Sequence, residues 1–384
     1  MEFKREKESV SASQLLQAIA DGDDIVLTNC TVTGLLDINR LFDPSEKFQT
    51  EKLRVNQEGD IKTLVIAQSI VFDKCLFEEN VIFAAPWSDP DSVSVVFESD
   101  TVFNSSIFQS QGRFRNATFK GIGSFDGCSF SSVITFRNAC FEKEAKFRTV
   151  HFSGYCLFSS AEFKTSARFT NSHFVKGVNF SGARFCSQTD FNGVYASSRS
   201  VPAYESVSFG RKRFGDDESF WRFVKQSAQE AGYYRLAGDC FYNERCASLW
   251  YKFTGLNYEG LSPLKKVLRL VSSIRLLPEL LLGRLLFGYG ERPMRVLFAC
   301  GVIIIFCALF FSLPGALIYR QGQAELSFFQ GLYFSTITFT TLGYGDLYPS
   351  TEGFYRHLAM TEAIAGGFLM ALFVVCLAKR FSRG

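Results

Sequence analysis

Phenylalanine recurs in a regular pattern through much of the N-terminal half of the chain. From Phe103 to Phe191 the steps between phenylalanines alternate between five and six residues, and most follow a small or β-branched residue two positions earlier. Residues i and i−2 of a strand lie on the same face, so each phenylalanine and its small partner are predicted to point into one core. Self-similarity at a fixed period is typical of a solenoid, and this step does not return to one face of a helix.

Two long uncharged or apolar stretches lie near the C-terminus. Apart from Arg295, the chain carries no charge from Met294 to Tyr319, and the second stretch runs from about Phe354 to Ala378. Each is long enough to cross a hydrocarbon layer about 30 Å thick. The apolar segment 327–340 between them is too short to span, because TLGYGD follows it, and this profile predicts a re-entrant helix packed against protein. The alternative is two ordinary transmembrane helices joined by an apolar loop.

The middle of the chain has apolar residues at helical spacing. Residues 219–253 are predicted to form one or two amphipathic helices, broken near Gly232 and Gly238, that pack against a neighbouring element or another subunit. Leu261–Phe287 mixes leucines with lysines and arginines. That composition suits a helix in the membrane interface, with its basic side chains toward anionic head groups.

The segment 341–346, TLGYGD, has the most specific chemistry in the chain. A run of backbone carbonyls that replaces the hydration shell of an ion is how potassium filters work, and Thr-x-Gly-Tyr-Gly builds such a run. Consecutive carbonyls can face one axis only if alternate residues adopt unusual dihedral angles, including left-handed ones that glycine accepts without steric cost. We therefore predict an ion filter between the two spans.

Residues 294–384 resemble the pore module of two-transmembrane prokaryotic potassium channels, with an outer helix, a pore helix, a filter and an inner helix in that order. The resemblance implies K⁺ bound by filter carbonyls, support from the pore helix and a glycine hinge in the inner helix. On this basis the ion-binding residues are Thr341, Leu342, Gly343, Tyr344 and Gly345, with K⁺ at the first four, the supporting residues are Tyr333, Phe334 and Asp346, and the hinge and gate residues are Gly366, Gly367 and Phe373.

The pore helix departs from the family pattern at one position. Many members of the family carry a carboxylate on the pore helix that pairs with the Asp after the filter, but Ile337 stands at the matching position. Asp346 must therefore find another partner or face the outer mouth. Close helix packing is an equal alternative to a hinge for the two glycines of the inner helix. Glu362, inside the second span, is expected to face the back of the pore helix rather than lipid.

The assembly and its orientation follow from the single pore loop and the basic residues. Four loops are needed to surround an ion, so we expect a homotetramer with cyclic symmetry. Lys379 and Arg380 follow the second span, and Arg292 and Arg295 flank the start of the first. The positive-inside rule then places both termini in the cytosol, at the cell inner (plasma) membrane. Expected partners are further copies of the chain and membrane lipids, with anionic lipids as one option; K⁺ is the permeant ion and no cofactor is expected.

The phenylalanine repeat resembles the pentapeptide-repeat proteins, whose right-handed four-sided β-helix stacks a large and a small inward residue on every face. The extra residue in alternate repeats is a departure and implies coils of about 22 rather than about 20 residues. Ile25–Ile38 and Leu64–Phe83 are expected to form less regular coils, and Ser11–Ala20 a helix that covers the open end. The expected fold is thus a cytosolic β-helix, an α-helical connector and an α-helical two-transmembrane pore module with a re-entrant loop.

These patterns divide the chain into segments. We expect a capping helix over 1–24, the β-helix over 25–195, a linker over 196–216, connector helices over 217–255, an interfacial helix and turn over 256–292 and the pore domain over 293–384. Inside the pore domain we expect the outer helix over 294–318, the pore helix over 327–340, the filter over 341–345 and the inner helix over 354–378.

Composition narrows the functional classes. Basic residues modestly outnumber acidic ones over 97–195, which argues against an acidic mimic of DNA, and no nucleic-acid partner is expected. The 11 cysteines show no metal-ligand spacing and fit a reduced cytosolic domain. His151, His173 and His357 look isolated along the chain, so we expect no catalytic centre and no enzyme.

Two functions remain open on sequence grounds. The first is a potassium-selective homotetrameric channel whose pore is modulated by the β-helix, with no regulatory ligand assigned. The second is a membrane-anchored scaffold whose pore is silent. No helix carries Lys or Arg at every third position in an apolar background, so voltage is not the expected stimulus.

Overall fold

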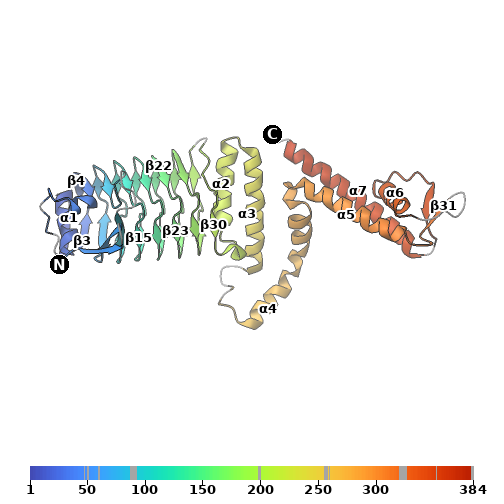
Figure 1. The fold of residues 1–384 in the computed structure, drawn as a ribbon, viewed down its shortest axis with the longest axis horizontal. Helices are drawn as coiled ribbons and strands as arrows, with labels where there is room; N and C mark the ends of the chain where they lie inside the picture. The colour runs from blue at the N-terminus through green and yellow to red at the C-terminus, as the bar shows by residue number, and fades with distance from the viewer. Residues whose placement is uncertain are drawn as a thin grey trace. The chain divides into compact units, whose positions relative to one another are not determined.

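The computed structural model describes residues 1–46, 48–49, 52–58, 61–86, 93–197, 200–254, 258, 260–319, 327–351 and 353–381. They form two compact units, Met1–Gly260 and Leu261–Gly384 (Figure 1).

The first unit is a β-helix whose short strands stack into four sheets, all with parallel pairing except between β6 and β7. The first sheet contains β1 (Glu2–Glu6), β3 (Asp24–Thr28), β8 (Ile70–Asp73), β12 (Thr101–Val102), β16 (Gly123–Ser124), β20 (Ala145–Lys146), β24 (Ala167–Arg168) and β28 (Thr189–Asp190). The second contains β2 (Ser9–Ser11), β4 (Thr31–Thr33), β9 (Leu76–Phe77), β13 (Ile107–Phe108), β17 (Ser129–Phe130), β21 (His151–Phe152), β25 (His173–Phe174) and β29 (Tyr195–Ala196). The third contains β5 (Leu36–Asp37), β10 (Val81–Ile82), β14 (Gly112–Arg113), β18 (Ile134–Thr135), β22 (Tyr155–Leu157) and β26 (Gly177–Asn179). The fourth contains β6 (Arg54–Glu58), β7 (Ile61–Ile66), β11 (Val93–Phe97), β15 (Thr118–Phe119), β19 (Cys140–Phe141), β23 (Glu162–Phe163), β27 (Arg184–Phe185) and β30 (Ser208–Phe209).

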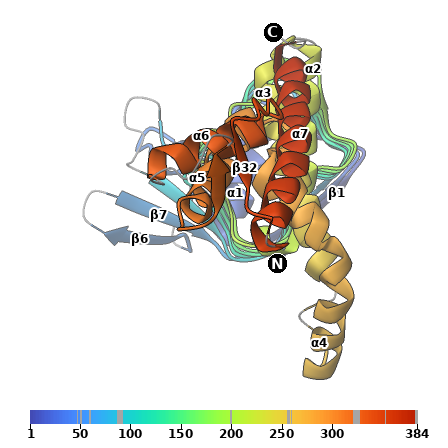
Figure 2. The ribbon, with the colours of Figure 1, turned by 90° about the vertical axis from the view of Figure 1, so that its right-hand side faces the viewer.

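Consecutive regular coils are offset by 22 residues, as the repeat predicts. In the fourth sheet Phe119 pairs in register with Phe141, and Phe141 with Phe163, while Lys164 of one coil bonds to Glu142 of the coil before it, 22 residues earlier. Viewed along the stack, the coils superpose and the β6–β7 hairpin projects from them (Figure 2).

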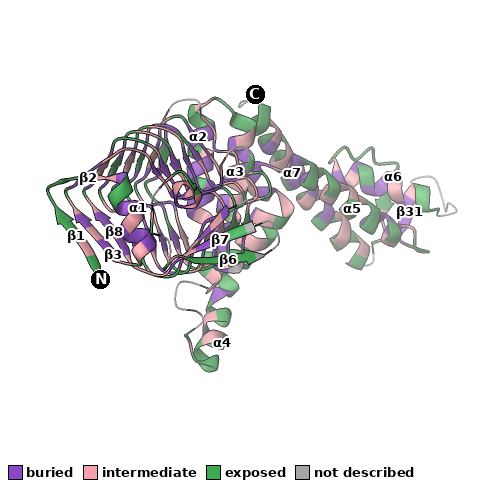
Figure 3. Ribbon diagram, turned by 60° about the vertical axis from the view of Figure 1, so that its left-hand side comes forward, coloured by how far each residue is buried: buried purple, intermediate pink, exposed green. Residues whose placement is uncertain are grey.

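Stacked phenylalanines fill the inside of the coils. The rings of Phe119 and Phe141 are parallel to within 2°, with centroids 4.7 Å apart, and both side chains are fully buried. The small partners, such as Ala139 and Ala161, are buried beside them, which confirms the predicted inward placement (Figure 3). The tight turns use a left-handed residue every eleven positions. These residues, with φ between +54° and +72°, are Asn116, Gly127, Asn138, Thr149, Ser160, Asn171 and Gly182.

The N-terminal end of the β-helix is covered by α1 (Ala12–Asp21), which buries Leu15, Leu16 and Ile19. A capping box between Ser11 and Gln14 starts this helix. The expected capping helix over 1–24 is therefore too long. The residues before α1 form β1 and β2, whose backbones pair with β3 and β4 and complete the first coil. The short helix η1 (Ile38–Phe42) follows β5.

The segment expected as a linker, 196–216, is instead part of the last coil. Ala196 ends β29, which pairs with β25, and β30 pairs with β27. Phe209 stacks on Phe185 with centroids 5.2 Å apart, so the apolar core continues through this Ser- and Gly-rich stretch. A short helix, η2 (Lys212–Phe214), follows β30.

The two connector helices are α2 (Glu218–Glu230) and α3 (Tyr234–Thr254). Phe220 meets Phe191 and Phe209 at centroid distances of 5.1 and 5.2 Å, so α2 covers the C-terminal end of the phenylalanine stack. The break between the helices lies at Gly232, which has φ +81°, whereas Gly238 is inside α3.

The second unit is helical. The expected interfacial segment comprises α4 (Pro263–Ser272), η3 (Ser273–Leu276), the π-helical η4 (Glu279–Leu286) and η5 (Gly288–Gly290). After it come α5 (Pro293–Phe311), β31 (Leu317–Tyr319), α6 (Phe328–Phe339), β32 (Leu347–Pro349) and α7 (Gly353–Phe381). By length and composition α5 and α7 could each cross a membrane, and α6 packs against both.

The outer helix ends at Phe311, earlier than the expected residue 318. Pro314 and Gly315 follow, and Gly315 has φ +79°, a left-handed conformation that stops a helix. The chain then turns back as β31, which pairs antiparallel with β32. This two-stranded connection joins the segment after α5 to the segment after TLGYGD, and the sequence pattern did not predict it.

Candidate functional site

The backbone of TLGYGD alternates between left-handed and ordinary conformations. Thr341, Gly343 and Gly345 have φ of +59°, +50° and +75°, whereas the residues between them do not have positive φ. This alternation confirms the predicted dihedral pattern. Thr341 is the informative case, because a β-branched residue adopts this conformation only when its surroundings impose it.

The end of α6 anchors the start of this segment. The amide of Thr341 donates to the Thr338 carbonyl at 3.0 Å, and the amides of Leu342 and Gly343 both donate to the Ile337 carbonyl, at 2.9 and 3.3 Å. Residues 341–345 are all exposed in the single chain, including the large side chains of Leu342 and Tyr344 at 61% and 70%.

Asp346 has a hydrogen-bond partner on α6. The Tyr333 hydroxyl donates to Asp346 Oδ2 at 3.0 Å, so the structure brings together two of the three predicted supporting residues. Ile337, which stands where related pores have a carboxylate, is buried in an apolar cluster with Phe311 and Leu347. The tyrosine hydroxyl thus takes the place of the missing acid as the partner of Asp346.

Phe334, the third residue expected to support the filter, packs against α5 within the single chain. Its ring packs edge-on against Phe311 of α5, with centroids 4.8 Å apart and an interplanar angle of 82°. Beside it, a Cβ at Gly331 would lie 2.5 Å from the Ala308 carbonyl oxygen, so α6 and α5 are in backbone contact. Phe334 therefore fixes α6 against the outer helix.

The two glycines of α7 have different surroundings. A Cβ on Gly366 would lie 2.0 Å from the carbonyl oxygen of Phe339, at the end of α6, so this glycine permits close packing. Gly367 has nothing within 4 Å of the corresponding position. Since α7 is helical from 353 to 381, Gly367 is the residue of the pair that could bend without loss of a contact.

Phe373 lies on the packed face of α7 and not on its open face. It contacts the cluster formed by Val296, Phe339, Leu369 and Cys376. Val374, the next residue, is 62% exposed and lies on the open face with Gly367.

Glu362 faces α6, as expected for a carboxylate within a span. Its side chain is only 2% exposed, and the Ser335 hydroxyl of α6 donates to it. Ser335 was not singled out from the sequence. The signal was available, because a buried carboxylate in a membrane segment needs a polar partner and Ser335 is a hydroxyl on the buried side of the short helix.

The end of α7 is tied to the turn before α5. Lys379 forms an ion pair with Glu291 at 2.8 Å and donates to the carbonyl oxygen of Tyr289 at 3.1 Å. The Glu291 side chain is 7% exposed, which strengthens the pair relative to one on an open surface. Leu286 and Phe287, from the end of η4, pack on the same cluster as the inner face of α7.

The helix α4 presents two opposite faces and buries no residue. Leu264, Val267, Leu268 and Val271 lie on one side and are 56–72% exposed. Lys265, Lys266 and Arg269 lie on the other side. One side of α4 is therefore apolar and the other is basic.

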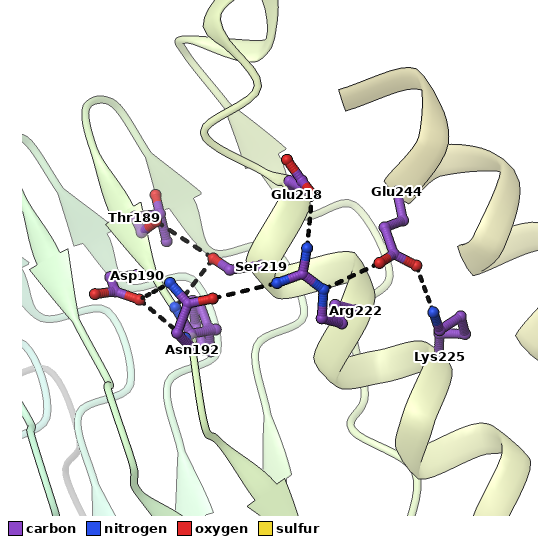
Figure 4. Close-up of polar contacts among 9 residues, drawn as sticks. Thr189, Asp190, Asn192, Glu218, Ser219, Arg222, Lys225 and Glu244 are labelled. Carbon is purple, nitrogen blue, oxygen red and sulfur yellow. Dashed lines mark hydrogen bonds and ion pairs between the residues drawn. The ribbon is translucent and has the colours of Figure 1, made fainter. Parts of the chain in front are cut away.

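A polar network joins the last coils of the β-helix to α2 and α3 (Figure 4). Arg222 of α2 donates to Asn192 at 3.3 Å, to Glu218 at 2.6 Å and to Glu244 of α3 at 3.1 Å. Lys225 also pairs with Glu244, at 2.6 Å. These contacts, beside an open cavity of about 370 Å³, fix the connector helices to the β-helix.

Two families match parts of the chain. Residues 298–383 match the ion channel family, and residues 147–194 match the pentapeptide repeats (9 copies). The first match covers most of α5 together with α6, the TLGYGD segment and α7, and the second lies within the regular coils. No curated protein and no solved structure matches the chain.

Proposed function

Because the chain joins a pentapeptide-repeat β-helix to a two-transmembrane ion channel domain, we propose that it is a potassium-selective channel. The observation that carries this proposal is the alternation of left-handed residues at Thr341, Gly343 and Gly345. It occurs in a TLGYGD segment that starts at the end of a short helix between two membrane spans. K⁺ would be bound by the carbonyl oxygens of Thr341, Leu342, Gly343 and Tyr344.

The channel is a homotetramer in this proposal. Each chain supplies one filter segment, and four are needed to surround an ion. The exposure of Leu342 and Tyr344, and of the face of α7 that carries Gly367 and Val374, supports this assembly. These surfaces would meet neighbouring subunits or line the pore.

Both termini lie on the cytosolic side of the inner (plasma) membrane in this proposal. Lys379 and Arg380 at the end of α7, and Arg292 and Arg295 at the start of α5, favour that orientation. The basic and apolar faces of α4 then favour contact with the inner leaflet, and anionic lipids would be the preferred partners. We assign no enzymatic activity to the chain.

The β-helix modulates the pore through the connector in this proposal. Arg222 and Glu244 hold α2 and α3 to the last coils. From α3 the chain continues into α4, and further along, the ion pair between Lys379 and Glu291 ties the turn before α5 to the end of α7. A force on this segment would therefore act on the inner helix.

Flux measurements on liposomes test the proposal. Vesicles that contain the purified tetramer and K⁺, diluted into Na⁺, should develop an inside-negative potential that drives proton uptake through a protonophore. Gly345→Ala should abolish this signal because φ +75° is strained for any other residue, whereas Gly301→Ala, at an open position of α5, should not. Verified wild-type tetramers without K⁺ flux would instead favour a scaffold with a silent pore.

A further inference from the structure

His151 and His173 occupy equivalent positions in consecutive coils of the β-helix. They pair in register between β21 and β25, and their Nδ1 atoms are 3.2 Å apart. Along the sequence both look isolated, but they are 22 residues apart, which is the length of one coil. The repeat period alone would therefore have predicted that they meet.

The separation of the two nitrogens suits a shared metal ion. Two imidazole nitrogens that bind one ion at about 2.0–2.1 Å lie about 3.3–3.4 Å apart in tetrahedral geometry and about 2.8–3.0 Å apart in square-planar geometry. The observed 3.2 Å lies between these values and is also the length of a hydrogen bond between the two rings, which a bound ion would replace. The strands that carry the two histidines, β21 and β25, also pair with β17 on one side and with β29 on the other. This pairing restricts the positions of both rings before an ion binds.

Neighbouring groups fix the orientation of His173. Its ring stacks on Tyr195 with centroids 4.0 Å apart, and its Nε2 lies 2.5 Å from the Ser197 hydroxyl oxygen. If Nε2–H donates to Ser197, Nδ1 of His173 keeps its lone pair on the side of His151, and outer partners of this kind usually orient a metal-binding histidine.

We propose that His151 and His173 form a two-histidine site for a divalent transition-metal ion of the zinc, copper or nickel class. Imidazole ligands select these ions over Ca²⁺ and Mg²⁺, which prefer oxygen. His151 is exposed, so water can complete the coordination. Within the described residues no group of three or more His, Cys, Asp or Glu side chains is arranged to hold a metal, so two protein ligands define the site. The ion would join two successive coils and stabilise the β-helix; this inference is independent of ion conduction.

Metal titration of the full chain tests the site. The protein is purified in detergent without a polyhistidine tag, stripped with a chelator and titrated with Zn²⁺ by calorimetry. His151→Gln and His173→Gln should each weaken binding at least tenfold, because a single imidazole remains. The chain has 3 histidines, so His357→Gln provides a matched control that should bind as wild type. Cys186→Ser, which removes an exposed thiol, should also leave binding unchanged.

Spectroscopy and stability give two further readouts. Cu²⁺ bound to the wild type should show electron paramagnetic resonance hyperfine splitting from two nitrogens, which each His→Gln variant should lose. Zn²⁺ should raise the unfolding temperature of the wild type but not of His151→Gln, once circular dichroism has shown that this variant is folded. Binding that survives both histidine substitutions, or that is lost in the His357 or Cys186 variant instead, would overturn the proposal.

Discussion

Truncation of one central phenylalanine should strongly destabilise the β-helix. Phe147 is fully buried and stacks between Phe125 and Phe169, with centroids at 5.2 and 5.0 Å. Phe136 and Phe158 meet it edge-on, at 5.3 and 5.2 Å. Phe147→Ala would remove the ring from the middle of this column and leave a cavity bounded by other rings.

The expected loss in the free energy of unfolding follows from the contacts that the Phe147 ring makes. Phe→Ala substitutions in cores cost about 3–5 kcal/mol, and the cost rises when the surroundings cannot collapse. The coils above and below Phe147 are held in register by backbone hydrogen bonds, so they cannot close around the gap. Each lost aromatic pair also forfeits about 0.5–1.5 kcal/mol beyond its buried area. We therefore expect a loss in the upper part of the range.

Chemical unfolding of the fragment Met1–Gly260 measures this loss. The fragment is one compact unit whose phenylalanine stack is covered by α1 and α2. Urea titrations followed by circular dichroism should show a much lower midpoint for Phe147→Ala. Tyr155→Ala is the matched control, since Tyr155 begins β22, eight residues after Phe147, but is 56% exposed, and surface substitutions usually change stability by only about 0.5 kcal/mol. Equal midpoints for the two variants would refute the inward stacking.

Three other perturbations have defined outcomes. Tyr333→Phe removes the hydrogen bond to Asp346 and should speed the decay of current during sustained opening; an unchanged time course would show that this bond does not hold the filter. Lys379→Ala removes the ion pair that ties α7 to the turn before α5, and single-channel recordings should show an altered open probability, which Lys379→Arg should largely restore. Burial, and then His151, lower the pKa of His173, so the imidazole binds a proton more readily in the unfolded chain than in the folded one. The free energy of unfolding should therefore be highest above pH 6.5, where the imidazole is neutral in both states, and should decrease as the pH falls below 6.5. Urea midpoints in chelator at pH 7.5 and 5.5 test this, and an equal pH dependence in His173→Gln would contradict it.

The regular parts of both units could be predicted from the sequence, because the spacing of residues over a few positions is set directly by the local backbone geometry. The five-six spacing of phenylalanine led to the 22-residue coil and to the buried face, and TLGYGD between two apolar stretches led to the dihedral pattern of the filter. The helix break at Gly232 was also predicted, since left-handed glycine ends helices.

The errors arose where tertiary contacts override local composition. Residues 196–216 read as a linker because they are polar, yet Phe209 continues the stack. The side of a helix that faces a neighbouring helix cannot be derived from an apolar sequence alone, so the contact of Phe334 with Phe311 and the packing of Phe373 on the cluster around Leu369 were not predicted. The pairing of His151 with His173 was missed for the opposite reason, because the period that was read for phenylalanine was not applied to other residues.

The central claim is that this pore selects K⁺, and the reversal potential under bi-ionic conditions tests it most directly. Purified wild-type protein in a planar bilayer, with K⁺ on one side and Na⁺ on the other, should give currents that reverse close to the potassium equilibrium potential. Gly343→Ala should move or abolish that reversal, since Gly343 has φ +50° within the filter. Wild-type currents that reverse near zero would contradict a potassium-selective filter.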